Sequence, residues 1–298
     1  MTLRMGIDLG GTKIEAVVID RQGVVQFRKR VPTPSGDYDG TVRALAALVT
    51  EADATFGAQP TVGVGIPGTI SPATRLIKNA NSVCLIGHAL DKDLAAAIGR
   101  PVRLSNDADC FALSEASDGA GADANIVFGV ILGTGVGGGI VVNKRIVCGP
   151  NAITGEWGHN PLPWPRADEV PGAACYCGLN GCIETFLSGG GLSRDYARSI
   201  VDGPEIVRRA EAGEPEAVAS MDRYVDRLAR ATATVINLID PDVIVLGGGL
   251  SNIARLYTDV PKRWPAYVFS DTVVTRLVPP KYGDASGVRG AAWLWDAP

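Results

Sequence analysis

The chain has 298 residues, of which 46% are hydrophobic and 20% are charged. This is a globular composition, and the length allows one large domain or two lobes with their own cores. The formal net charge of −4 gives no electrostatic reason to expect nucleic acid, whose binding proteins usually carry a basic surface. The first residues show no signal-peptide pattern, and the uncharged run 126–142 is too short and glycine-rich to span a membrane comfortably. We therefore expect a cytoplasmic protein without a membrane partner.

Strand and helix patterns alternate along the first half, and the second half is more helical. In the first half the patterns predict two strands within 5–20, a strand at 24–27, a helix at 40–56, a strand at 61–66, a helix at 91–98 between an Asp91 cap and a Gly99 stop, a strand at 102–104 and a helix at 109–116. In the second half they predict two strands within 126–142, helices at 205–212 and 216–240, a strand from 241 that ends in a glycine turn, and a closing helix at 290–295.

An internal repeat links the two halves. Residues 6–12 align without gaps on residues 129–135, and the match continues from 17–20 to 140–143. Both copies read as strand, glycine turn, strand, turn, strand, so they predict a duplicated lobe with a cleft between the copies. The alternative is that any two glycine-rich hairpins look alike.

Three glycine turns follow apolar strands, and they point to a bound polyphosphate. They are Gly10-Gly11-Thr12, Gly133-Thr134-Gly135 and Gly247-Gly248-Gly249. Glycine lets backbone N–H groups approach an anion closely, and Lys13 adds a side-chain donor. The first turn leads into a strand and lacks the Walker A pattern, so it is neither a P-loop nor a dinucleotide fingerprint. Asp8, just before it, could hold Mg²⁺ through water. The alternative is that these turns only close tight hairpins.

A short polar run follows the strand predicted at 102–104. It contains Asn106, Asp107 and Asp109, and polar residues at such strand ends often carry function. Phosphoryl transfer needs a base that accepts the proton of the attacking hydroxyl, and aspartate is a common choice. Asp107 and Asp109 compete for that role, and either could simply cap the following helix.

Three of the six cysteines form a tight cluster that points to a metal. Cys175, Cys177 and Cys182, together with His159, make a Cys₃His set typical of closed, tetrahedral zinc. A closed site indicates a structural ion. The alternative is three unrelated thiols and a buried histidine. Zinc on one ring nitrogen of His159 would leave the other as an oriented donor, with Glu156 and Glu184 beside it to accept hydrogen bonds from a polyol.

These motifs together resemble the ROK family of sugar kinases, and most closely its bacterial fructokinase (manno(fructo)kinase) branch. The resemblance covers nearly the whole chain. It is carried by Asp8-Leu-Gly-Gly-Thr-Lys13, Gly63-Val-Gly-Ile-Pro-Gly68, Lys78-Asn-Ala-Asn-Ser82, Asn106-Asp107, Gly155-Glu-Trp-Gly-His-Asn-Pro-Leu-Pro163, the run from Cys175 to Glu184 and Asp240-Pro-Asp-Val-Ile-Val-Leu-Gly-Gly-Gly249.

The resemblance implies an α/β, two-lobed, actin-like ATPase (ribonuclease H-like) fold with duplicated domains and a zinc-binding loop. It implies an N-terminal lobe of residues 1–117, joined by a C-terminal helix at 286–298, and a C-terminal lobe of residues 118–285. It implies Asp107 as the catalytic base, a hexose site on Gly68, Asn81, Asn106, Asp107, Glu156, His159 and Glu184, and zinc on His159, Cys175, Cys177 and Cys182. ATP with Mg²⁺ would lie along Asp8, Gly10, Gly11, Thr12, Lys13, Gly133, Thr134, Gly135, Gly248 and Gly249.

The resemblance also implies a homodimer that phosphorylates fructose with ATP to give fructose 6-phosphate. Glucose, mannose and N-acetylglucosamine are alternative substrates, because they differ from fructose by small polar rearrangements. A sugar-sensing ROK regulator is the alternative from another class, although Asp8 lies too near the start to leave room for a DNA-binding module. A filament-forming actin relative would not need the zinc loop, and a zinc hydrolase would need an open coordination position.

Overall fold

The computed structural model describes residues 3–80, 82–196 and 201–295. Two five-stranded sheets dominate it, in the orders β3-β2-β1-β4-β7 and β10-β9-β8-β11-β12. The first sheet consists of β1 (Arg4–Leu9), β2 (Lys13–Ile19), β3 (Val25–Pro32), β4 (Thr61–Ile66) and β7 (Val102–Asn106). The second consists of β8 (Ile126–Leu132), β9 (Val136–Val142), β10 (Arg145–Ile146), β11 (Val243–Gly247) and β12 (Arg276–Val278), and a hairpin of β5 (Thr69–Ile70) and β6 (Ile77–Lys78) stands apart.

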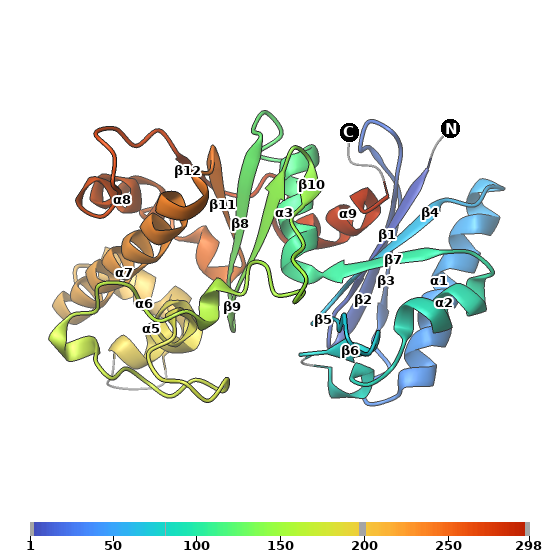
Figure 1. Ribbon diagram of the computed structural model, residues 1–298, viewed down its shortest axis with the longest axis horizontal. Helices are drawn as coiled ribbons and strands as arrows, with labels where there is room; N and C mark the ends of the chain where they lie inside the picture. Colours follow the sequence, from blue (N-terminus) through green and yellow to red (C-terminus); the bar gives the residue numbers. More distant parts are fainter. Residues whose placement is uncertain (1–2, 81, 197–200, 296–298) are drawn as a thin grey trace.

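Helices cover the sheets and lie between them (Figure 1). They are α1 (Tyr38–Phe56), α2 (Leu90–Ile98), α3 (Asp107–Ser117), α4 (Ile183–Leu187), α5 (Gly189–Tyr196), α6 (Gly203–Glu211), α7 (Pro215–Ile239), α8 (Leu256–Arg263) and α9 (Ser286–Trp293). Within the described ranges, no helix combines the length and the apolar character needed to cross a membrane.

Most predicted elements are present, with shifted ends. The helix predicted at 91–98 begins at Leu90 with Ala89 as its N-cap, so the assignment of Asp91 as the cap is wrong, whereas Gly99 ends it in the left-handed conformation with φ of 71°. The helix predicted at 109–116 begins earlier, at Asp107, because the Asn106 side chain accepts a hydrogen bond from Ala108 N and caps it. The sequence patterns missed the short strands β5, β6 and β12 and the helices α4, α5 and α8, whereas β10 is the third strand that the repeat predicts in its second copy.

The internal repeat corresponds to a repeat of topology. In each sheet three antiparallel strands are followed by two parallel ones in the same order. The aligned glycines Gly6 and Gly129 have the same structural role in the two copies, since each lets a helix backbone approach its sheet closely. A Cβ on Gly6 would lie 2.0 Å from Val288 O of α9, and one on Gly129 would lie 2.8 Å from the Cα of Ala112 in α3. The duplicated, two-lobed α/β architecture is therefore confirmed.

Each half of the chain sends its last helix across to the other half's sheet. Helix α9 packs on β1 and β4, while α3 packs on β8 and β9, so both lie between the sheets in Figure 1. The two helices cross in direct contact, because a Cβ on Gly290 would lie 1.6 Å from Cys110 O. Helix α3 thus belongs by packing to the second sheet, although its residues fall within the range 1–117 predicted for the first lobe; the exact lobe boundary stays a prediction.

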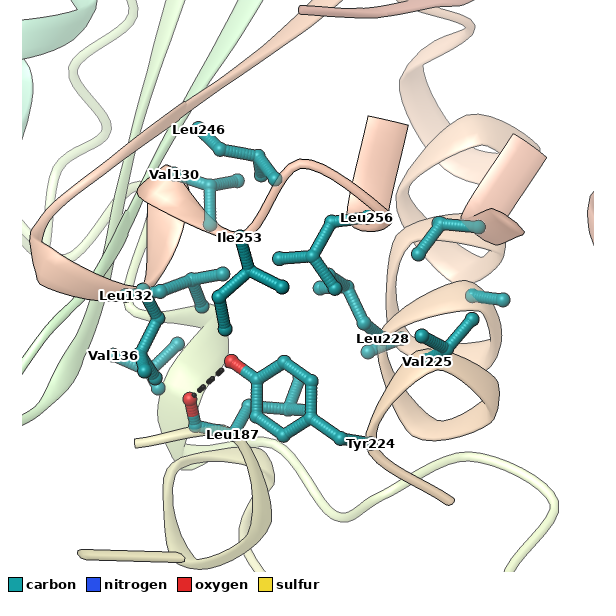
Figure 2. Close-up of a cluster of buried hydrophobic side chains, with 14 of the residues drawn as sticks. Val130, Leu132, Val136, Leu187, Tyr224, Val225, Leu228, Leu246, Ile253 and Leu256 are labelled. Carbon is teal, nitrogen blue, oxygen red and sulfur yellow. Dashed lines mark hydrogen bonds between the residues drawn. The ribbon is translucent and has the colours of Figure 1, made fainter. Parts of the chain in front are cut away.

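The core of the second lobe holds one of the candidate site elements in place. In Figure 2, apolar side chains of β8, β9, β11 and α7 gather around Tyr224, which is 1% exposed. Its hydroxyl donates a hydrogen bond of 2.9 Å to the Leu187 carbonyl at the end of α4. Because α4 is only five residues long and carries Glu184, this buried bond helps to fix the direction of that carboxylate.

Candidate functional site

Two adjoining hollows lie at the junction of the sheets. The larger, of about 850 Å³, is lined by residues from β7, the start of α3, the turn after β8, the segment 146–159 and α4. The smaller, of about 420 Å³, is lined by the turn after β1, Gly248 and the segment 283–287. Asp107, Pro67 and Ile131 line both hollows. A ligand in one hollow can therefore meet a ligand in the other beside the Asp107 carboxylate.

Asp107 owes its position to the end of β7. Strand β7 pairs in parallel with β4, and the chain turns into α3 at Asn106, whose side-chain amide also donates a hydrogen bond of 3.3 Å to Gly68 O. Asp107 is thereby the first helical residue, and its Oδ1 accepts a hydrogen bond of 2.8 Å from Ala108 N. A carboxylate at this end of a helix is favoured by the helix dipole.

The electrostatics of the site oppose ionisation of Asp8, Asp107 and Asp109. The Asp107 side chain is open to solvent on the cleft side, yet protein atoms surround it elsewhere, and this desolvation together with the Glu156 charge raises its pKa against the lowering effect of its hydrogen bonds. Burial, chiefly, raises the pKa of Asp8 to about 6 and that of Asp109 to about 7, and the Asp107 charge contributes to both. Asp109 accepts a hydrogen bond of 3.2 Å from Ser105 Oγ, and its other oxygen is buried without a partner.

The larger hollow brings together the residues expected to hold a sugar. Gly68, Asn106, Asp107, Glu156, His159 and Glu184 all line it. Asn81 lies outside the described residues, so its predicted role stays a prediction. Glu184 Oε2 accepts a hydrogen bond of 2.9 Å from Val136 N, which joins α4 to the start of β9. Polar acceptors therefore converge on the space in front of Asp107.

The turn that carries Glu156 and His159 is fixed by an aromatic anchor. Trp157, 6% exposed, packs edge-on against Phe128 and donates a hydrogen bond of 3.0 Å from Nε1 to Gly137 O. Gly158 lies against the backbone of β9, where a Cβ would come within 2.2 Å of Val136 O. Trp157 and Gly158 thus pack the turn against the second sheet, and the polar residues Glu156 and His159 line the larger hollow.

His159 and the three cysteines lie close enough together to bind one ion. Their ligand atoms all lie within 4.8 Å of one another, with 3.5 Å between His159 Nδ1 and Cys175 Sγ and 3.6 Å between the Sγ atoms of Cys177 and Cys182. Bond lengths of about 2.0–2.3 Å place tetrahedral ligands about 3.3–3.8 Å apart, so the donor set fits zinc in both chemistry and size.

Backbone pairing brings these ligands together from separate segments. Leu162 N donates to Gly181 O and Ile183 N donates to Asn160 O, so the segment after His159 runs beside the segment around Cys182. The hairpin that carries Cys175 and Cys177 closes through Gly178 with φ of 93°. The Cys₃His pattern was therefore a correct guide to proximity.

The predicted polyphosphate turns divide between the two hollows. Asp8, Gly10, Gly11 and Gly248 line the smaller one, and Gly133, Thr134 and Gly135 line the larger one. Thr12, Lys13 and Gly249 line neither of them: Lys13 is the first residue of β2, Thr12 directly precedes it, and Gly249 begins the short helix after β11. Gly248 and the turn after β8 nevertheless lie together, since a Cβ on Gly248 would come within 2.4 Å of Leu132 O.

Comparison with known proteins gives the same picture over the whole chain. The model of the ROK family matches residues 4–297. The chain belongs to the ROK family. It is 43% identical to an N-acetyl-D-glucosamine kinase of Yersinia enterocolitica over 97% of this chain and 98% of that protein. The ROK hexokinase of Thermus thermophilus has a TM-score of 0.86 and 32% identity, covering 98% of this chain and 97% of that one. A ROK glucokinase of Streptomyces griseus, solved with glucose and AMPPNP, has a TM-score of 0.77 and 28% identity, with 98% of each chain covered.

These findings confirm the prediction of a ROK-family sugar kinase and of the actin-like fold. They do not support the fructokinase branch. The sequence resemblance rested on motifs that hold hydroxyls common to several hexoses, so it could not separate the branches, and the relatives favour the alternative of N-acetylglucosamine. The predicted homodimer stays a prediction.

The sequence missed several residues that this ROK chain places at the site. Gly283 and Asp284, in the short turn before α9, and Gly287, in its first turn, line the smaller hollow, and a Cβ on Gly287 would lie 3.8 Å from Asp8 Oδ2. The sequence signal that could have revealed them is a pair of glycines that flank a polar residue beside the predicted closing helix. Tyr176 lines the larger hollow, with its hydroxyl 2.9 Å from His159 Nε2. Burial and the charges of Glu184 and Glu156 raise the pKa of the Tyr176 hydroxyl.

The metal site gives a direct prediction for the purified protein. We expect about one zinc per chain, and we expect Cys182→Ser to lose most of it, because a closed site depends on all four ligands. Elemental analysis of the dialysed proteins measures this. Cys84→Ser, which changes a cysteine outside the cluster, is the matched control and should keep its zinc. Wild-type protein that carries no zinc while fully active would contradict the assignment.

Proposed function

We propose that this protein is an ATP-dependent kinase for N-acetylglucosamine, which transfers the γ-phosphoryl group to the primary hydroxyl of the sugar. The observation that carries the proposal is that Asp107 lines both hollows, so one carboxylate faces the acceptor and the nucleotide. The choice of sugar rests on the 43% identity to an N-acetyl-D-glucosamine kinase over nearly the whole of both chains.

Asp107 is the proposed general base. Its carboxylate accepts the proton of the sugar hydroxyl, the hydroxyl oxygen forms a bond to the γ-phosphorus, and the bond between that phosphorus and the ADP oxygen breaks. Asn106 and Ala108 N hold the loop and the carboxylate in place before the sugar arrives. Such positioning accounts for much of the rate in phosphoryl transfer, because the protein supplies little covalent chemistry.

The sugar is oriented by groups on the opposite wall of the larger hollow. Glu156 and Glu184 accept hydrogen bonds from ring hydroxyls, and His159 donates one from the ring nitrogen that faces away from the cysteines. The larger hollow, of about 850 Å³, has room for a substituent beyond the hexose ring, and an acetamido group is such a substituent.

The nucleotide is proposed to lie in the smaller hollow, with its phosphates between the first two glycine turns. The N–H groups of the turn at Gly10 and Gly11 and of the turn at Gly133 to Gly135 suit phosphate oxygens. Asp8 would hold Mg²⁺, whose charge supplies neutralisation of the phosphate oxygens and would favour the ionised form of this carboxyl group. Zinc on the Cys₃His set would fix the loop that presents His159.

A substrate panel tests the proposed function. ADP release with MgATP is measured for N-acetylglucosamine, N-acetylmannosamine, glucose, mannose and fructose. We expect kcat/KM to be highest for N-acetylglucosamine, by about tenfold or more over glucose, since a pocket that accommodates the acetamido group loses its contacts when the group is absent. A higher kcat/KM for fructose or glucose would contradict the choice of sugar, and turnover of none of the five would contradict the kinase and favour a sugar-sensing regulator.

A further inference from the structure

Tyr176 holds a contact that the sugar would also use. It lies on the zinc hairpin between Cys175 and Cys177, and its side chain is 81% exposed. The hydroxyl oxygen is 2.9 Å from His159 Nε2, and the two rings meet edge-on, with centroids 5.0 Å apart and an interplanar angle of 88°. Both residues line the larger hollow together with Glu156 and Glu184.

The direction of the His159 ring determines which nitrogen is available. Nδ1 is the nitrogen on the cysteine side, 3.5 Å from Cys175 Sγ, so zinc would occupy Nδ1. Nε2 then carries the hydrogen and donates it to the Tyr176 hydroxyl. Nε2–H has one hydrogen to donate, and a hydroxyl of the sugar requires the same one.

We propose that Tyr176 competes with the sugar within the chain: the Tyr176 hydroxyl occupies the position on His159 that a sugar hydroxyl would take, until a substrate displaces it. The inference rests on the proposed function only in taking a sugar as the displacing ligand. A phenolic hydroxyl resembles a sugar hydroxyl in accepting from a ring N–H, so the free protein keeps the donor of His159 satisfied.

Little else holds the tyrosine in this position. Its ring is mostly exposed, and its hydrogen bond and its ring contact both go to His159. An intramolecular hydrogen bond contributes about 0.5–1.5 kcal/mol net, which corresponds to about a 2- to 12-fold change in an equilibrium. The need to displace the Tyr176 hydroxyl from His159 should therefore weaken sugar binding by about that factor without preventing it.

Tyr176→Phe tests the competition, because it removes the hydroxyl and keeps the ring. We expect the dissociation constant of the preferred sugar, measured by calorimetry without ATP, to fall about 2- to 12-fold. The KM for the sugar should fall in parallel, while the KM for ATP stays unchanged. Leu179→Ala, another exposed residue of the zinc hairpin, is the matched control and should change neither constant. Zinc content is measured in all three proteins.

A second readout does not depend on any substrate. The chain has only two histidines, His88 and His159, so the ¹⁵N resonances of His159 can be assigned by comparison with a His88→Gln variant. We expect Tyr176→Phe to shift the Nε2 signal of His159 in the sugar-free protein. An unmoved signal, or a sugar dissociation constant that is unchanged or higher in Tyr176→Phe, would overturn the inference. Failure of the proposed function is distinguishable, since it shows as absent turnover in the wild-type protein.

Discussion

Replacing Asp107 by Asn is expected to lower kcat about 10²- to 10⁴-fold, the usual contribution of a general base. The amide has nearly the same shape and cannot accept the proton of the sugar hydroxyl. The loss should appear in kcat with every sugar of the panel and is measured by ADP release at saturating MgATP. The helix should remain, because the Asn106 cap is intact and a first-turn charge contributes only about 0.3–1 kcal/mol.

Asp109→Asn is the matched control for that experiment. Asp109 lies two residues further along α3 and accepts its hydrogen bond from Ser105, so its carboxyl group is engaged with β7. We expect Asp109→Asn to keep kcat within about tenfold of the wild-type value, well above that of Asp107→Asn. If kcat were instead lower for Asp109→Asn than for Asp107→Asn, Asp109 would be the general base, the alternative that the sequence left open.

The pH dependence gives the same assignment a second check. Because desolvation and the Glu156 charge raise the pKa of Asp107, the fraction of ionised base decreases as the pH falls through that raised value. Wild-type kcat/KM should therefore decline on the acid side at a higher pH than an ordinary aspartate would give. Glu156→Gln removes one of the raising charges, so it should move the acid limb to lower pH in addition to weakening sugar binding.

The sequence could predict the site where short patterns carry the chemistry. Spacing within the segment 175–182 indicated the three cysteines of the Cys₃His set, and the gapless repeat indicated that the turn after Leu9 and the turn after Leu132 are equivalent. Both signals are local, because a ligand spacing or a strand–turn–strand unit is complete within about twenty residues. The paired contacts of Gly6 and Gly129 explain why the repeat persists at these positions.

The rest depended on contacts between distant segments. Asp284 reaches the hollow of Asp8 only because α9 crosses onto the first sheet, and no local pattern records that crossing. Tyr176 was not predicted as a site residue, because the C-x-C motif does not reveal which way the side chain between the two cysteines points. The sugar itself depends on the shape of the larger hollow, to which several segments contribute.

A buried ion network in the second lobe was also invisible in the sequence. Glu169, 5% exposed, accepts hydrogen bonds from Arg230 Nη2 at 2.8 and 2.9 Å, from Arg227 Nε at 2.7 Å and from Arg166 N at 2.8 Å. Arg230 also donates to the carbonyls of Pro163 and Trp164. The network fastens residues 163–169 to α7, and the chain runs on from there to Gly172, which lies against Gly181 next to Cys182.

Glu169→Gln is expected to lower the free energy of unfolding by about 3–5 kcal/mol at pH 7, because it leaves the charges of Arg227 and Arg230 buried with less compensation. Chemical denaturation with the same protein concentrations measures this. Glu205→Gln is the matched control. The pKa of Glu205 is lowered to about 2, chiefly by the hydrogen bond from Arg208. Burial raises the pKa of Glu169, but its hydrogen bonds, with that from Arg230 the strongest of them, outweigh the burial and lower this pKa to about 2 as well. Glu205 lies at the surface, where water screens its pairs, so its variant should change stability far less.

The pH dependence of stability gives a second readout for Glu169. A carboxyl group whose pKa is lower in the folded protein stabilises it above the unfolded value of 4.5, and this contribution is lost as the pH falls toward about 2. Wild-type stability should therefore decrease between about pH 4.5 and pH 2, and Glu169→Gln should show a shallower decrease because the group no longer titrates. If Glu169→Gln unfolds with the same free energy as the wild type, or follows the same acid limb, the network contributes nothing that an amide cannot supply. The ordering of 163–169 would then have to come from the apolar contacts of Leu162 and of Trp164 with Tyr267.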